Sequence, residues 1–100
     1  MNLLGTYILT TSAGVSVGIA GNPKRVYFVT NISDGTATVT KLYNGTTADT
    51  ANFVLQVDGV ISKGASNFIH SDMGIRFDKG LYVAGDAHTV GGCIVYEEEF

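Results

Sequence analysis

Residues 25–31 read Arg25-Val26-Tyr27-Phe28-Val29-Thr30-Asn31, and this run decides the fold class. Its β-branched and aromatic residues are those enriched in strands, and apolar side chains fall on both faces of the run. A strand that is apolar on both faces is covered on both sides, which predicts a central position. The pair Asp34-Gly35 then predicts a turn.

Blocks of the same kind recur on both sides of that run, separated by Gly, Asn, Asp and Ser. We expect strands or short extended segments at 3–10, 15–19, 36–43, 53–57, 67–70, 73–80, 81–84 and 89–97. No stretch keeps apolar residues at helical spacing for more than two turns. About eight short strands predict an all-β, antiparallel two-sheet sandwich of the jelly-roll type, with residues 1–100 as a single domain.

Two-residue periodicity also assigns side chains to faces. The sets expected to share a face are Val15, Val17 and Ile19; Phe53, Leu55 and Val57; and a polar stripe of Thr36, Thr38 and Thr40, opposite Ala37 and Val39. Asn44-Gly45 predicts a tight turn, and Gly80 is expected at a positive φ.

The composition limits the classes of function. Hydrophobic residues make up 45% and charged residues 15% of the chain, against about 25% charged residues in an average soluble protein. This deficit predicts a neutral, Thr-rich surface together with surface buried in an oligomer. The net charge of −3, with six Lys and Arg spread along the chain, argues against nucleic-acid binding because no basic stripe is present.

The ends and the cysteine content predict the compartment. The N-terminus lacks a positively charged segment, and no run approaches the about 18 apolar residues of a membrane span, so we expect no signal peptide, no membrane and a cytoplasmic protein. Cys93 is the only cysteine, which excludes an intrachain disulfide, and its neighbours predict a buried strand position.

Three groups of polar residues are candidates for chemistry or binding. His70-Ser71-Asp72 and Asp86-Ala87-His88 are short His/Asp pairs that would suit a divalent metal if two loops met, but their spacing is not diagnostic, and we interpret them as solvated loop residues. No Gly-x-Ser-x-Gly elbow is present, and the aspartates sit at turns, so we expect no metal, no cofactor and no enzyme. Glu97–Glu99 is expected to be a solvated tail or edge protection, or else a docking segment for basic residues.

Three segments carry a resemblance to a known family. They are Val39-Thr40-Lys41-Leu42-Tyr43-Asn44-Gly45-Thr46-Thr47, Gly74-Ile75-Arg76-Phe77-Asp78-Lys79-Gly80-Leu81-Tyr82-Val83 and Ile94-Val95-Tyr96-Glu97. Over about residues 26 to 97 the chain resembles small jelly-roll structural proteins of tailed-bacteriophage virions. The resemblance implies a capsid decoration (cement) protein, often a homotrimer, assembled in the host cytoplasm and bound in the virion to the major capsid protein or another virion protein. It supplies no catalytic residues.

The expected interface lies first in residues 1–10. We predict that Leu3, Leu4 and Tyr7 belong to an arm or edge strand that pairs with another chain; alternatively, this strand completes its own sheet. The loop residues Asn44, Asp72 and His88 are further candidates for the interface.

A receptor- or carbohydrate-binding module on a phage tail or capsid is the alternative function. Such sites present exposed aromatic platforms, and this chain has no Trp, while its five Tyr lie mostly within apolar strands. Tyr43, beside the Asn-Gly turn, is the tyrosine expected to be most exposed.

Overall fold

The computed structural model describes residues 3–9, 14–36, 38–58 and 66–99, with the backbone alone described for 3, 4, 6–9, 66 and 67. The elements in these ranges are β1 (Leu3–Leu9), β2 (Val15–Ser16), β3 (Lys24–Ser33), β4 (Val39–Asn44), the 3-10 turn η1 (Thr50–Asn52), β5 (Phe53–Asp58), β6 (Ser66–Phe77), β7 (Leu81–Ala84) and β8 (Thr89–Glu98). No helix in the described part of the chain is long and apolar enough to cross a membrane.

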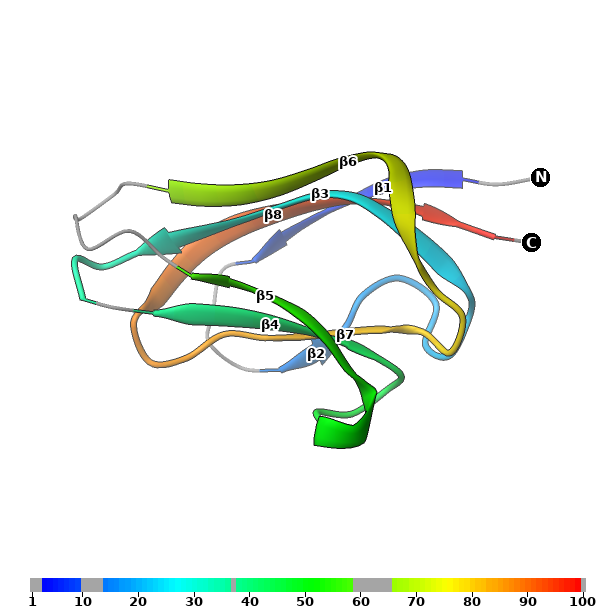
Figure 1. Cartoon of the computed structure of the whole chain (residues 1–100), viewed down its shortest axis with the longest axis horizontal. Coiled ribbons are helices and arrows are strands. Elements are labelled where there is room, and N and C mark those ends of the chain that lie inside the picture. The colour runs from blue at the N-terminus through cyan, green and yellow to red at the C-terminus, as the bar shows by residue number, and fades with distance from the viewer. Residues whose placement is uncertain (1–2, 10–13, 37, 59–65, 100) are drawn as a thin grey trace.

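The strands form two antiparallel four-stranded sheets that stack face to face (Figure 1). Sheet A has the order β1-β8-β3-β6, and sheet B has the order β2-β7-β4-β5. All connections except β4–β5 cross from one sheet to the other, which is the arrangement of an eight-stranded jelly roll. The predicted fold class is therefore confirmed. So is the central position of residues 25–31, because β3 lies between β8 and β6.

Two of the expected elements differ from the prediction. Residues 67–70 and 73–77 are one continuous edge strand, β6, in which Gly74 adopts φ 76° and lets the strand bend without ending it. The expected strand 15–19 keeps only two residues, because Gly18 at φ 69° turns the chain. Val17 is consequently buried in the core, whereas Ile19 is 52% exposed.

The core lies between the sheets and is built from aliphatic residues and one phenylalanine. Its buried members are Val17, Val26, Val29, Leu42, Val57, Phe77, Leu81, Val83 and Ile94. Two residues of the predicted threonine stripe also face inward, since Thr38, just before β4, and Thr40, on β4, are buried, whereas Thr36 is exposed. Polar side chains thus occupy part of the interior, and Thr38 is bonded there to Thr89 and Asp86.

A buried ion pair ties the 17–22 loop to the end of β8. Lys24 is fully buried, and its Nζ lies 3.0 Å from Glu98 Oε1 and donates to the carbonyls of Ile19 and Asn22. Glu98 accepts hydrogen bonds from Ile19 N at 2.6 Å and from Asn22 Nδ2 at 3.1 Å. The expectation that residues 97–99 form a solvated tail is therefore wrong for Glu98, whose partners are Lys24 at the start of β3 and Ile19 and Asn22 in the loop.

Candidate functional site

The outer face of sheet A is set by the register of its central strands. Phe28 lies opposite Val95 and His70, and Thr30 lies opposite Cys93 and Phe68. Directly paired residues share a face, and their neighbours Val29 and Ile94 are core residues, so these side chains point away from the core. The rings of Phe28 and Phe68 stack on this face at 5.6 Å.

We call the apolar residues of this face the apolar strip: Phe28, Ile32, Phe68, Cys93 and Val95, with the exposed Val90 at its end, in the bulge of β8 beside Gly91. Phe68 is 60% and Val90 53% exposed, and the other four are half-buried. Cys93 therefore lies on the outer face, and the prediction of a buried position is wrong. Large apolar groups grouped on the outside of a sandwich indicate a surface used for association.

At the other end of the same face, basic and acidic side chains neutralise one another. Arg76 donates two hydrogen bonds to the Glu99 carboxylate, from Nε and from Nη2, and Nη2 lies 2.9 Å from Oε2. Arg25 Nε lies 3.9 Å from Oε1 of the same carboxylate. This carboxylate raises the pKa of the Arg76 guanidinium. Tyr27 donates a hydrogen bond to Glu97 at 3.3 Å. The charges at this end bond to one another, and the apolar strip carries none.

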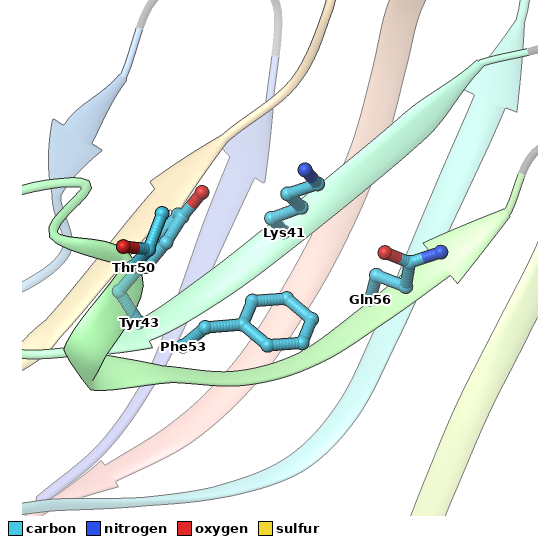
Figure 2. A pocket seen from close by; sticks show the side chains of 5 residues that line it. All are labelled: Lys41, Tyr43, Thr50, Phe53 and Gln56. Carbon is cyan, nitrogen blue, oxygen red and sulfur yellow. The ribbon is translucent and has the colours of Figure 1, made fainter.

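The outer face of sheet B carries a shallow groove of about 240 Å³, which we call the platform groove (Figure 2). It is lined by Lys41, Tyr43, Thr50, Phe53 and Gln56. Lys41 and Gln56 are directly paired on β4 and β5, and η1 contributes Thr50. Figure 2 shows the Phe53 ring in the middle of the group, between Tyr43 and Gln56.

A bulge puts Phe53 on the outside. The register of β4 and β5 shifts between Leu42 and Tyr43, so Tyr43 pairs with Phe53 and Leu42 pairs with Leu55. Phe53 is 43% exposed, whereas Tyr43, expected to be the exposed tyrosine, is 6% exposed. The ring of Tyr43 makes edge-to-face contacts with the rings of Phe53 and Tyr82, at centroid distances of 5.9 Å and 6.2 Å. The buried Tyr43 ring therefore restrains the position of the Phe53 ring. The prediction that Phe53 shares a face with Leu55 and Val57 is wrong.

A second groove, of about 350 Å³, runs along the other side of Lys41 and Tyr43. Its far wall is the β7–β8 connection with Asp86. Burial opposes ionisation of Asp86, but hydrogen bonds from Thr38 Oγ1, His88 N and Val39 N outweigh it and lower the pKa of this carboxyl. Asp86 therefore organises the loop as a carboxylate.

The residues predicted for the interface fall in four separate places. Leu3, Leu4 and Tyr7 lie on β1, which pairs with β8 along its whole length, so this strand completes its own sheet as an edge strand. Their side chains lie outside the described part of the structure. Asn44 bonds to Asp78 and Lys79 N at the β6–β7 turn.

Asp72 and His88, the other two predicted interface residues, lie far apart in the fold. Asp72 is exposed on β6 and 3.4 Å from His70. His88, in the β7–β8 loop, lies 3.0 Å from Asp34 Oδ2. The His70/Asp72 and Asp86/His88 pairs therefore do not converge. Within the described ranges, no three His, Cys, Asp or Glu side chains are grouped as metal ligands.

Comparisons with known proteins show a likeness of fold. No protein-family model and no curated protein matches the chain. One solved structure that resembles it comes from Bacillus endospore appendages, described as a novel family of disulfide-linked pili. The match has a TM-score of 0.55 and 11% sequence identity, and it covers 99% of this chain and 88% of that chain. A small all-β domain of this shape therefore also occurs in a pilus.

Proposed function

We propose that the chain is a non-enzymatic structural subunit of a tailed-bacteriophage virion, a capsid decoration (cement) protein that forms a homotrimer and binds the shell. One observation carries the proposal: the apolar strip on the outer face of sheet A. Interfaces between subunits have apolar centres and polar rims, and on this face the apolar strip is flanked by the Arg76–Glu99 pair and by His70 and Asp72 on the edge strand β6.

The size of the face suits a second copy of the chain as its occupant. Strands spaced about 4.8 Å apart that rise about 3.3 Å per residue give four strands of about ten residues a flat area of about 600 Å². A standard interface takes about 800 Å² from each partner. With the sheet A faces turned toward a three-fold axis, each copy would share its strip with two neighbours and close the ring.

The structural likeness to a pilus protein supports assembly of this chain into oligomers, but not assembly through disulfide bonds. That protein is described as disulfide-linked. A single cysteine can join this chain to one other chain, because each sulfur forms one disulfide bond, and covalent polymers need at least two. Assembly of this chain therefore rests on the strip, with Cys93 as one of its apolar members.

The shell contact is assigned to the free edge of β1. This strand is bonded to β8 on one side and ends the sheet order on the other, so its outer edge offers backbone groups to a strand of a neighbouring subunit. Leu3, Leu4 and Tyr7 lie on this strand. A protein that binds only the assembled shell stabilises it by mass action.

The test uses a matched pair of variants. Val90→Lys puts a charge into the strip, and Ile19→Lys puts the same charge at an equally exposed position outside it (53% and 52% exposed). Both are mixed with empty shells of the major capsid protein of the same phage, and co-sedimentation and the melting temperature of the shell are measured. We expect wild type and Ile19→Lys to bind the shell and raise its melting temperature, and Val90→Lys and a second strip variant, Phe68→Asp, to fail. Equal binding by Val90→Lys and Ile19→Lys would contradict the proposal, as would wild type that does not bind.

A further inference from the structure

We propose that the platform groove on the outer face of sheet B binds an acidic saccharide, with the sugar ring on Phe53 and its carboxylate on Lys41. The groove lies on the sheet opposite the apolar strip, so it stays open when the chain assembles through sheet A. This is a second activity, beyond the structural role proposed above.

An exposed aromatic ring forms the platform of the groove. Phe53 is exposed at the surface, yet its ring is not loose, because Tyr43 meets it edge-on and is itself buried. The face of an aromatic ring carries partial negative charge and attracts the slightly positive C–H face of a sugar ring. A ring fixed in advance loses little conformational freedom on binding, which favours recognition of a small ligand.

Polar side chains surround the Phe53 ring. Lys41 offers an ammonium group, Thr50 a hydroxyl and Gln56 an amide, all around Phe53. Gln56 Nε2 is engaged by Asp58 at 3.0 Å, and Figure 2 shows its carbonyl oxygen on the side of Lys41. Sugar hydroxyls both donate and accept hydrogen bonds, so they match a mixed set of donors and acceptors. A few placed polar groups beside an apolar surface are typical of small-ligand sites.

The platform groove carries one positive charge. Lys41 is the sole charged residue among the five that line the platform groove. Lys24, Arg25 and Arg76 are in ion pairs, but Lys41 is exposed and forms none within the described part of the chain. On a chain of net charge −3, an available cation beside an aromatic ring selects an anionic substituent. A carboxylate on the sugar meets this requirement.

The test compares matched ligands and matched variants by NMR titration of the full chain. Methyl glucuronide is compared with methyl glucoside, and the methyl glycoside of sialic acid with its carboxamide; in each pair the second sugar lacks the carboxylate. The variants are Phe53→Ala and Lys41→Gln in the groove, with Phe68→Ala as the control, an exposed phenylalanine on the opposite sheet. Phe53 and Phe68 both have exposed rings, so either substitution leaves the core intact.

We expect at least one acidic sugar to bind wild type and to shift the amide signals of β4 and β5. The neutral partner should bind roughly two- to fivefold more weakly, the range of a single exposed ion pair. Phe53→Ala should weaken binding roughly tenfold. Lys41→Gln should remove the preference for the acid, and Phe68→Ala should bind like wild type.

Three results would overturn the proposal: no sugar of the panel binds, the acid preference survives in Lys41→Gln, or Phe53→Ala binds as wild type does. Loss of shell binding by Phe53→Ala would also overturn it, because the groove would then be a protein contact. The shell assay with the strip variants is independent of these outcomes, so the failure of one function is separable from the failure of the other.

Discussion

Substitution of Glu98 by Gln tests how the end of β8 is held. The change keeps the shape of the side chain but removes the charge that faces Lys24 Nζ at 3.0 Å. Lys24 is fully buried, so its ammonium group would keep only uncharged acceptors, namely the carbonyls of Ile19 and Asn22 and the amide oxygen of the substituted side chain. Breaking one side of a buried ion pair costs about 3–5 kcal/mol, because an uncompensated charge remains inside the protein.

This cost is large for a chain of this size. Domains of about 100 residues have unfolding free energies of about 5–15 kcal/mol, and about 3 kcal/mol lowers the melting temperature by roughly 12 °C or more. Glu99→Gln is the matched control at the next position, because Glu99 is paired with exposed Arg76. A surface pair contributes at most about 1 kcal/mol. Urea denaturation of the three proteins measures the difference, and a Glu98→Gln that costs no more than Glu99→Gln would refute the reasoning.

The same pair predicts the response to acid. Burial raises the pKa of Glu98, but the hydrogen bonds from Ile19 N, Asn22 and Lys24 and the charge of Lys24 together hold it below its ordinary value of 4.5. A depressed pKa in the folded state stabilises the fold above the ordinary pKa, and this stabilisation is lost as pH falls through the folded value. The stability difference between wild type and Glu98→Gln should therefore shrink in urea melts below about pH 4.5. A difference that is constant with pH would contradict this assignment.

Three further predictions concern other parts of the fold. Gly80→Ala should lower the unfolding free energy by about 1–3 kcal/mol, since φ is 118° and a Cβ would lie 2.9 Å from Gly45 O; urea melts equal to wild type would contradict this. Thr40→Val should raise the unfolding free energy by about 1 kcal/mol, because the buried Thr40 hydroxyl has no hydrogen-bond partner in the described structure; a measured loss would show that the hydroxyl is bonded. His88→Ala should raise the pKa of Asp34, since the hydrogen bond from His88 is the main cause of its lowered value; an NMR titration that gives an unchanged pKa would exclude that cause.

The fold was predictable because its signals are local and agree with one another. Residues 25–31 are apolar on both faces, and β3 has a sheet neighbour on each side. Gly80 precedes a strand after a polar turn, and its φ is positive as expected. Strand number and turn positions follow from side-chain periodicity and backbone sterics, which act within a few residues.

The surfaces were less predictable because they depend on contacts between distant segments. A bulge at Val54 moves Phe53 to the outside, and a bulge depends on the partner strand as much as on its own sequence. Glu98 is buried because Lys24, 74 residues away in sequence, needs a counter-charge. Thr38 faces inward because the β7–β8 loop supplies Asp86 as its partner. The charge run 97–99 by itself predicts a solvated segment, and only the folded chain brings Lys24 to Glu98.

Sedimentation velocity of the purified chain at micromolar concentration tests most directly whether the outer face of sheet A is an assembly surface. Wild type and Phe53→Ala should sediment with three times the mass of the 10.5 kDa chain, and Val90→Lys should sediment as a single copy. Wild type that stays at one copy across the concentration range, or Val90→Lys that keeps the trimer, would contradict the account.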